Sequence, residues 1–197
     1  TNLKKIAEEW VKARVSNNWQ KCNSSKRFIV MEKHYDEFLK YFVDYTNSLV
    51  VWDPENEKTQ VWPLAREDLV EEIDNQVKKT VSEWARLLAW WKNVWEKWYF
   101  YDPTVLADVT PEMTSYKEEV FGPVGSIIKV KDLDEAVKIA NNSHFWLCGC
   151  VYWDDEKELI EIASKIETWI VFINKPASSK ASLPFGWVKK SWYWKET

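Results

Sequence analysis

The segment "FGPVGSIIKVKDLDEAVKIANN", residues 121–142, gives the clearest indication of the fold of this chain. The run Ile127–Val130 is typical of a strand buried on both faces, and the segment 131–142 that follows it is typical of an N-capped helix. A buried strand that passes directly into a helix is the repeating unit of parallel sheets, because parallel neighbours need a crossover connection. The stretch therefore predicts an α/β fold.

The same alternation of helices and strands continues on both sides of this stretch. Apolar residues at helical spacing predict helices over Asn2–Arg14, His34–Val51, Arg66–Leu88 and Asp154–Glu167. Short apolar runs predict strands over Arg27–Glu32, Cys148–Trp153 and Ile170–Asn174, the last fully buried, and two more within 89–106 on either side of a proline. We therefore expect one α/β domain over residues 1–197, with a mostly parallel sheet flanked by helices.

The charge and the apolar runs exclude several classes of partner. The chain has 27 basic and 31 acidic residues, a net charge of -4, and no basic stretch that could follow a phosphate backbone. No apolar run approaches the roughly 20 residues of a membrane-spanning helix, and the first ten residues lack the features of a signal peptide. We expect a cytoplasmic protein that binds neither nucleic acid nor a membrane.

The cysteines are too few and odd in number for a disulfide framework. The chain has three of them, and the spacing of Cys148 and Cys150 is that of neither a redox pair nor a zinc site with a second pair of ligands. We expect reduced thiols and no metal site.

Tryptophan and glycine occur in an inverted ratio. The chain has 15 Trp and 4 Gly, whereas average usage of about 7% would give about 14 Gly. Many tryptophans fall at expected turns or element ends, where glycine is usual because it reaches positive φ without steric cost. These are Trp52, Trp62, Trp90, Trp91, Trp98, Trp187, Trp192 and Trp194. We predict that they occupy sites built for glycine, at a strain of roughly 1 to 3 kcal/mol each.

Six motifs carry a resemblance to a known family. "NNWQKC" (17–22) is similar to the G-Q-x-C motif of the aldehyde dehydrogenase superfamily, with Trp19 at the glycine, and "EEVFGPV" (118–124) is similar to its E-x-F-G-P motif. The other four follow in family order: "DPTVLADVTPEM" (102–113), "ANNSHFWL" (140–147), "ETWIVFIN" (167–174) and "LPFGWVKKSWYWKE" (183–196). The chain resembles this superfamily from about Val11 to its end.

Three further stretches narrow the resemblance. "KRFIV" (26–30), "TQVWPLARED" (59–68) and "INKPASSKASLPFG" (173–186) are most similar to the NAD(P)-dependent succinate-semialdehyde dehydrogenases. The resemblance implies a small-molecule aldehyde as substrate, succinate semialdehyde or a similar semialdehyde, and NAD or NADP as cofactor.

The resemblance assigns roles to individual residues. Cys22 matches the nucleophile, which attacks the aldehyde as a thiolate to give a thiohemiacetal and then a thioester. Glu119 matches the carboxylate that accepts hydrogen bonds from the ribose beside the nicotinamide, and Phe121 matches the aromatic residue next to the nicotinamide. The alternatives are an inert thiol at Cys22 and a simple capped turn at 118–124.

A loop near the C-terminus matches the family's substrate loop. Its residues Ser178, Ser179 and Lys180 could hold the distal carboxylate of a semialdehyde, and we take Ser179 as the candidate substrate-binding residue. An ordinary solvated loop is the alternative. Cys148 and Cys150 match no functional position of the family.

The chain also departs from the family pattern. Family members carry a dinucleotide-binding domain before the nucleophile, whereas here only 21 residues precede Cys22, and the C-terminal strand that serves oligomer contacts does not follow "KSWYWKET". On this basis residues 1–197 are expected to be the catalytic domain of a longer, homo-oligomeric enzyme, inactive alone.

Two hypotheses account for the tryptophans. In the first, codons that the source organism translates as glycine are written as tryptophan, because bacterial codes differ in how they translate UGA. In the second, the chain is an engineered Trp-rich scaffold. A non-catalytic relative with the same fold remains a further alternative to an enzyme.

Overall fold

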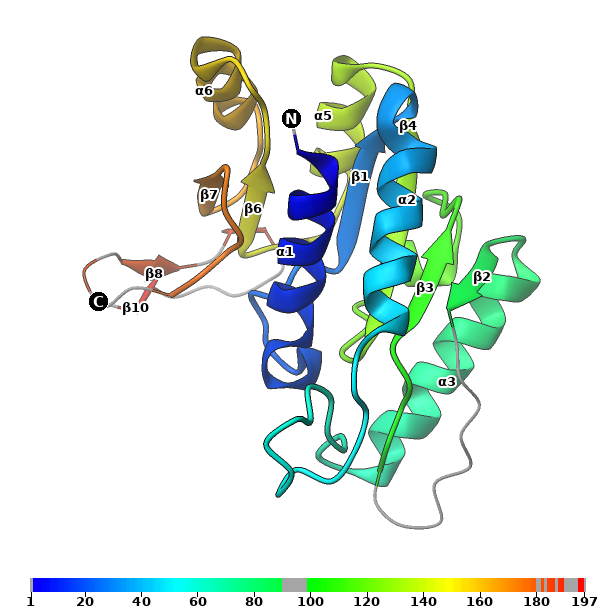
Figure 1. Cartoon of the computed structure of the whole chain (residues 1–197). Coiled ribbons are helices and arrows are strands. Elements are labelled where there is room, and N and C mark those ends of the chain that lie inside the picture. Colours follow the sequence, from blue (N-terminus) through cyan, green and yellow to red (C-terminus); the bar gives the residue numbers. More distant parts are fainter. Residues whose placement is uncertain are drawn as a thin grey trace.

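The strand expected at residues 127–130 lies at the centre of a four-stranded sheet. β4 (Val124–Val130) pairs in parallel with β1 (Arg27–Met31) on one side and β3 (Thr104–Ala107) on the other, and β2 (Arg86–Ala89) joins β3 in antiparallel orientation. The strand order is β1-β4-β3-β2 (Figure 1). The computed structural model describes residues 2–89, 99–179, 182, 184–186, 188–189 and 195–196.

Helices cover both faces of this sheet. α1 (Leu3–Val15) and α2 (Glu32–Asn47) pack on one face. The other face is covered by α3 (Glu67–Ser82), α4 (Thr114–Lys117) and α5 (Leu133–Asn141). The result is a three-layer α/β domain with a mostly parallel sheet, as the sequence predicts.

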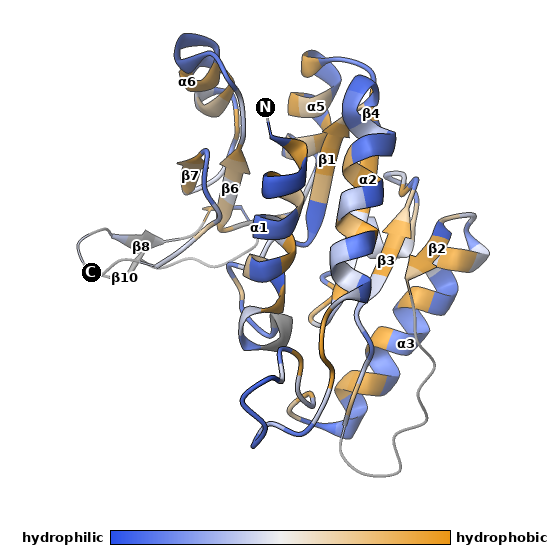
Figure 2. Cartoon of the chain, viewed as in Figure 1, coloured by the Kyte–Doolittle hydropathy of each residue, from blue (hydrophilic) through white to orange (hydrophobic). Residues whose placement is uncertain are grey.

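Two hydrophobic cores separate across the sheet because successive strand residues point to opposite faces. In β4, Ile127 packs in the core under α1 and α2, whereas Ile128 packs in the core under α3 and α5. In β3, Val105 and Leu106 divide in the same way. Figure 2 shows the consequence in the hydropathy: β1 and β3 are largely apolar, while the helices are polar on their outer faces.

The C-terminal third forms smaller sheets beside this one. β6 (Cys148–Val151) and β7 (Ile170–Ile173) pair in parallel, and α6 (Glu156–Ser164) connects them. Two short antiparallel pairs complete the described strands: β5 (Phe145–Trp146) with β9 (Val188–Lys189), and β8 (Phe185–Gly186) with β10 (Lys195–Glu196).

The prediction that the strand at Ile170–Asn174 is fully buried is wrong. Only Phe172 is buried in β7, and the side chain of Ile173 is 40% exposed. Within the described residues, β7 pairs only with β6 in a two-stranded sheet, so it lacks the second neighbouring strand that a central strand has.

The helix expected over Arg66–Leu88 is also shorter than predicted. α3 ends at Ser82, and residues 86–89 form β2 instead. The Trp84 amide donates to the Val81 carbonyl and the Ala85 amide donates to the Thr80 carbonyl, at 3.0 and 3.2 Å. These two bonds are the Schellman pattern that ends a helix, in which the residue after the cap takes a left-handed conformation.

Trp84 occupies the position in that pattern where glycine is usual. Its φ is 83° and its side chain is 89% exposed. The other described residues at positive φ, glycine excluded, are Asn17, Asp108, Asn174 and Lys189. Trp84 is therefore a tryptophan at a glycine-type site, and the sequence did not single it out because the helical pattern appeared to continue through it.

The expectation of positive φ is wrong for two of the tryptophans singled out from the sequence. Trp52 and Trp62 are both described and neither has positive φ. The backbone of Trp19 belongs to a 3-10 turn, η1 (Ser16–Trp19). Trp90, Trp91, Trp98, Trp187, Trp192 and Trp194 lie outside the described residues, as does most of the first strand expected in 89–106. The hypotheses on the origin of the tryptophans remain predictions.

Replacing Trp84 with glycine is expected to raise the free energy of unfolding by about 1 kcal/mol, because a left-handed conformation costs an L-residue about that much and the exposed indole contributes little burial. Urea denaturation of both variants measures the difference. Ser82→Gly is the matched control: Ser82 is exposed in the last turn of the same helix at helical dihedrals, so the substitution should lower the midpoint. A Trp84→Gly variant that unfolds at lower urea would contradict the assignment.

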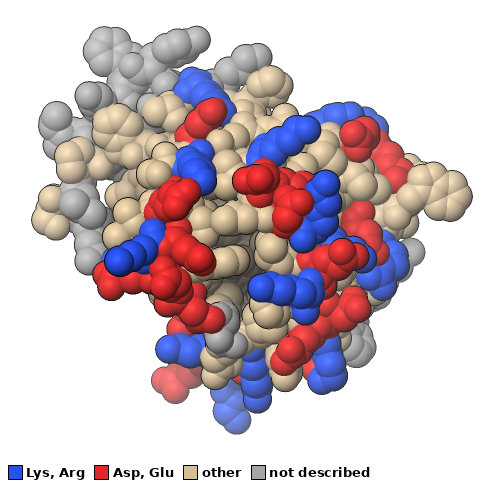
Figure 3. Space-filling model, turned by 90° about the horizontal axis from the view of Figure 1, so that it is seen from above, with Lys and Arg blue, Asp and Glu red and all other residues tan. Residues whose placement is uncertain are grey.

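Charges of both signs mix over the surface. Seen from above, lysines and arginines lie among aspartates and glutamates, so that on the described part of this face no large area carries a single sign (Figure 3). Within the described residues, no helix combines the length and the apolar character that crossing a membrane requires.

Candidate active site

Cys22 lies in the turn between η1 and β1, and its side chain is exposed. The turn is closed by the Ser24 amide, which donates to the Lys21 carbonyl at 3.2 Å. Asn17, which begins the approach to this turn, has a φ of 57°, and its side-chain amide donates to the Gln20 carbonyl. Asparagine tolerates this conformation better than most residues do, so the local sequence is suited to the bend that presents Cys22.

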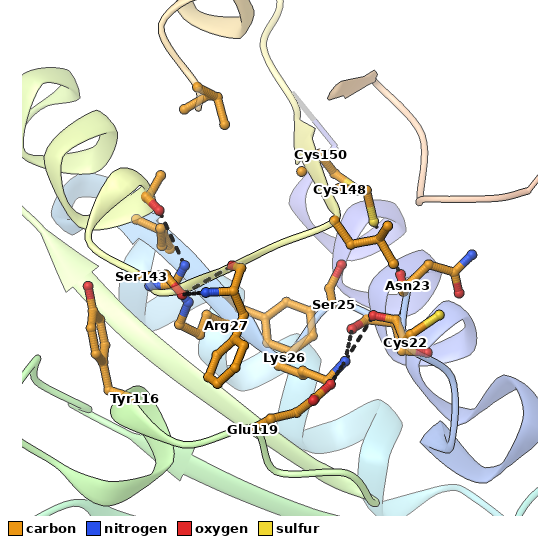
Figure 4. A pocket seen from close by; sticks show the side chains of 18 of the residues that line it. Cys22, Asn23, Ser25, Lys26, Arg27, Tyr116, Glu119, Ser143, Cys148 and Cys150 are labelled. Carbon is orange, nitrogen blue, oxygen red and sulfur yellow. Dashed lines mark hydrogen bonds and ion pairs between the residues drawn. The ribbon is translucent and has the colours of Figure 1, made fainter. Parts of the chain in front are cut away.

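Lys26 connects this turn to the segment that carries Glu119 and Phe121. The Lys26 ammonium donates to the Cys22 carbonyl at 3.0 Å and forms an ion pair with the Glu119 carboxylate at 2.8 Å. It also lies 5.4 Å from the centre of the Phe121 ring, within the range of a cation–π contact. Figure 4 shows Lys26 extending between Cys22 and Glu119.

Burial shapes the electrostatics of this contact. The Lys26 side chain is 19% exposed and that of Glu119 is 40% exposed. Burial lowers the pKa of Lys26, and the nearby charge of Arg14 lowers it further, while the Glu119 carboxylate opposes both effects. The ion pair therefore favours the charged ammonium at this position.

Arg14 also binds this loop, through the backbone of the loop. It is the last basic residue of α1 and is 1% exposed. Its guanidinium donates to the backbone carbonyls of Val120, Gly122 and Val124 at 3.1, 2.9 and 3.0 Å. Burial lowers the pKa of Arg14 to about 9 and the Glu119 carboxylate opposes that shift, so the side chain stays protonated at neutral pH. The helix that precedes Cys22 is thus tied to the loop of Glu119.

Ser179 reaches the site through Asn23. The side-chain amide of Asn23, next to Cys22, donates to the Ser179 hydroxyl at 3.3 Å. Ser178 and Ser179 are both exposed, and Lys180 lies outside the described residues. The four residues singled out from the sequence therefore lie in one region of the structure: Cys22, Glu119, Phe121 and Ser179. Lys26 connects Cys22 with Glu119 and Phe121, and Asn23 connects the Cys22 turn with Ser179.

A cavity of about 360 Å³ opens beside Cys22. Its lining includes Cys22, Lys26, Arg27, Glu119, Ser143 and Cys148. Phe121 and Ser179 contact the lining residues Lys26 and Asn23. The volume is that of a small-molecule site, and the lining mixes apolar surface with a few polar groups.

The other two thiols share this cavity but differ chemically from Cys22. Cys148 and Cys150 lie on β6 and are partly buried. Burial raises the pKa of Cys148 to about 12, assisted by the neighbouring thiol of Cys150, and burial also raises the pKa of Cys150. At neutral pH both are protonated and therefore weak nucleophiles.

Iodoacetamide at pH 8 is expected to label Cys22 at least about 10-fold faster than Cys148 or Cys150, because Cys22 is exposed whereas the raised pKa of the other two leaves them as neutral thiols. Peptide mass spectrometry over a time course gives the three rates. The Cys22→Ser variant, in which the fast phase should vanish, is the control. Equal and slow labelling of all three would favour a non-catalytic relative with the same fold.

Sequence analysis missed two residues of the site, Arg14 and Lys26. Arg14 fits the polar spacing of an amphipathic helix, and its partners are backbone carbonyls that carry no sequence signal. Lys26 belongs to the stretch "KRFIV", whose only signal is its similarity to the family. Its position four residues after Cys22 was the available clue. Among the described residues, no group of three or more His, Cys, Asp or Glu side chains is placed to hold a metal ion.

The fold and the site define a three-layer α/β domain that presents an exposed cysteine beside a small-molecule cavity. Within that class, the chain belongs to the aldehyde dehydrogenase family, whose model matches residues 1–197.

Individual relatives are similar over nearly the whole chain. The succinate semialdehyde dehydrogenase [NAD(P)+] Sad of Escherichia coli (strain K12) is 40% identical over 186 residues, which cover 94% of this chain and 40% of that protein. The crystal structure of succinic semialdehyde dehydrogenase from Streptococcus pyogenes in complex with NADP+ has a TM-score of 0.92 and 32% identity, over 97% of this chain and 42% of that one. A Mycobacterium tuberculosis aldehyde dehydrogenase complexed with NAD+ has a TM-score of 0.92 and 30% identity, over 97% of this chain and 40% of that one. The chain thus spans about two fifths of the length of these relatives.

Proposed function

We propose that residues 1–197 form the thiol-bearing catalytic domain of an NAD(P)-dependent enzyme that oxidises succinate semialdehyde to the carboxylic acid. The observation that carries the proposal is a small-molecule cavity lined by Cys22 and Glu119. Phe121 and Ser179 lie beside it, in contact with the lining residues Lys26 and Asn23. Similarity to succinate-semialdehyde dehydrogenases over nearly the whole chain supports the choice of substrate.

Cys22 is the nucleophile in this proposal. Its thiolate adds to the aldehyde carbon, forming the carbon–sulfur bond of a thiohemiacetal, and the oxidised acyl group is then held on the same sulfur as a thioester that water opens. The exposed position of Cys22 beside the cavity allows the approach of a carbonyl carbon. The Lys26 ammonium donates to the backbone carbonyl of the same residue and so helps to hold the turn that presents the thiol.

Glu119 and Phe121 fit the ribose and nicotinamide end of a dinucleotide. The Glu119 side chain is 40% exposed and only one of its oxygens pairs with Lys26 in the ion pair, so the carboxylate has room to accept hydrogen bonds from vicinal hydroxyls. Phe121 lies on the same loop and offers an apolar ring beside it. When bound, NAD or NADP supplies the hydride acceptor.

Ser179 is suited to hold the distal carboxylate of the semialdehyde. It is exposed, and its hydroxyl lies next to Asn23, one residue from the nucleophile. A hydroxyl and a side-chain amide beside the nucleophile's turn can donate hydrogen bonds to the carboxylate of a four-carbon substrate. This role would distinguish a semialdehyde with a carboxylate from a neutral aldehyde of the same length.

The test is formation of NADH or NADPH by the gene product that contains these residues, produced at its full natural length. Succinate semialdehyde should be oxidised with a kcat/KM at least about 10-fold above that for butanal, because only the former offers a carboxylate for the charge-assisted hydrogen bonds. Oxidation of butanal with equal efficiency would contradict the substrate, and oxidation of neither would contradict the reaction. We also infer that the acting enzyme is longer than these residues, as its relatives are, and that it assembles as a homo-oligomer.

A further inference from the structure

We propose that Lys26 is a positioning residue that holds the loop of Glu119 and Phe121 against the turn of Cys22. The inference rests on the proposed function of this site and adds to it a residue that links the thiol to the cofactor contacts. It starts from the fact that one ammonium group contacts all three residues.

The Lys26 ammonium donates hydrogen bonds to two different segments, the Cys22 turn and the Glu119 loop. One set of bonds goes to the turn, where the Cys22 carbonyl accepts at 3.0 Å and the carbonyls of Lys21 and Ser24 lie at 3.4 Å. The other goes to Glu119, at 2.8 Å. Three donors on one nitrogen allow such a fork, and a charged donor makes each bond stronger than a neutral one.

The geometry makes Lys26 a positioning residue, distinct from a catalytic one. Its described hydrogen bonds go to backbone carbonyls of the turn and to the Glu119 carboxylate, and none goes to the Cys22 sulfur. Lys26 precedes β1 directly, so its backbone is anchored by the parallel pairing of β1 with β4. Because its backbone is held in this way and its ammonium binds both segments, Lys26 sets the distance between the Cys22 turn and the Glu119 loop.

Arg14 cannot replace Lys26 in this role. Its guanidinium binds the carbonyls of Val120, Gly122 and Val124 and so fixes the backbone of the loop. These bonds fix the backbone that follows Glu119 and are not made to its carboxylate. Lys26 is the described group that orients this carboxylate directly, since the ion pair is made at the carboxylate itself.

The ion pair between Lys26 and Glu119 is tested by the dissociation constants of NAD and NADP. They are measured by equilibrium dialysis, without aldehyde, on the full-length gene product. Lys26→Met is expected to weaken the binding of the preferred dinucleotide about 10-fold, and Glu119→Gln about as much. The double variant should bind no more weakly than Glu119→Gln alone, because Lys26 acts through Glu119. Effects of the two substitutions that multiply, or unchanged binding in Lys26→Met, would overturn the proposal.

The hydrogen bond from Lys26 to the Cys22 carbonyl is tested by the rate at which iodoacetamide labels Cys22 at pH 7.5. This measurement needs neither cofactor nor turnover. Lys26→Met should slow labelling of Cys22 about 5-fold or more, since the turn that presents the thiol loses its charge-assisted hydrogen bond. Lys26→Arg keeps the charge and the donors and should stay within about twofold of the parent, which also serves if Lys26→Met does not fold. Lys21→Met, in the same turn, is the matched control, because its ammonium donates to the Ser16 hydroxyl and, in the described structure, to neither the Cys22 carbonyl nor Glu119.

The two readouts separate this proposal from the function on which it rests. If the parent protein binds neither dinucleotide, the proposed function fails, whereas the labelling rates still decide whether Lys26 supports the Cys22 turn. If the parent binds a dinucleotide and oxidises the semialdehyde, but Lys26→Met changes only the urea midpoint, the positioning role is refuted and the function stands.

Discussion

Replacing Cys22 with serine is expected to lower the rate of succinate semialdehyde oxidation by more than about 1,000-fold. The thiol is the exposed sulfur beside the cavity, and no other described thiol can take its place, because Cys148 and Cys150 are partly buried with raised pKa values. A serine hydroxyl is almost fully protonated at neutral pH and is a far weaker nucleophile. Formation of NADH or NADPH by the full-length gene product, with the parent as reference, gives the ratio of rates.

Controls separate the loss of the nucleophile from a loss of structure. Cys148→Ser and Cys150→Ser change a sulfur to an oxygen in the same cavity and should retain most of the activity. Cys22→Ser should keep the urea midpoint of the parent and its affinity for the dinucleotide, because the Cys22 contact to Lys26 is made by the backbone carbonyl. Activity of the Cys22→Ser variant within about tenfold of the parent would exclude Cys22 as the nucleophile.

Arg14→Met is expected to lower the free energy of unfolding by about 3 kcal/mol, because three buried backbone carbonyls lose the guanidinium donor, and of these Gly122 keeps a bond from the Val124 amide. Methionine has a similar length and fills most of the same space, so the loss reports chiefly on hydrogen bonds. Against a typical total of about 5–15 kcal/mol, this is a large share. Urea denaturation followed by tryptophan fluorescence measures the change.

Two further variants test the cause of that loss. Arg66→Met removes an exposed arginine whose partner, Asp68, lies two residues away, and it should leave the urea midpoint unchanged. Arg14→Lys keeps one charged donor group and should recover part of the stability. If Arg14→Met unfolds at the same urea concentration as the parent, the guanidinium does not stabilise the loop of Val120–Val124. Arg14 would then not be the residue that holds α1 against this loop.

Local patterns predicted most of the secondary structure. The run Ile127–Val130 and the helical pattern after it correspond to β4 and α5, because continuous apolar character and a capped amphipathic repeat are properties of short segments. The end of α3 was missed for the converse reason. The helix stops where the backbone at Trp84 turns left-handed, and a tryptophan at that position gives no signal for such a turn.

Burial was harder to predict than the presence of a strand. Ile170–Ile173 has the composition of a central strand, yet it lies in a two-stranded sheet with one residue buried. An apolar run indicates that a segment can be buried on both faces. Whether it is depends on how many neighbours the rest of the chain supplies, which is a property of the assembled fold.

The amino-acid sequence was enough to predict the α/β class and the family, and its motifs marked Cys22, Glu119, Phe121 and Ser179 as candidate site residues. Motifs of consecutive residues and the helical or strand spacing of apolar residues are local properties of the sequence, so they can be recognised without coordinates. Only the tertiary structure showed which groups bring those residues together. Arg14 binds carbonyls more than 100 positions away, and Asn23 bonds to Ser179 across 156 positions. Every residue has a backbone carbonyl, so residue type does not indicate which carbonyls a buried arginine or lysine will bind. Folding alone makes that choice, because it decides which carbonyls are withdrawn from water and need a donor.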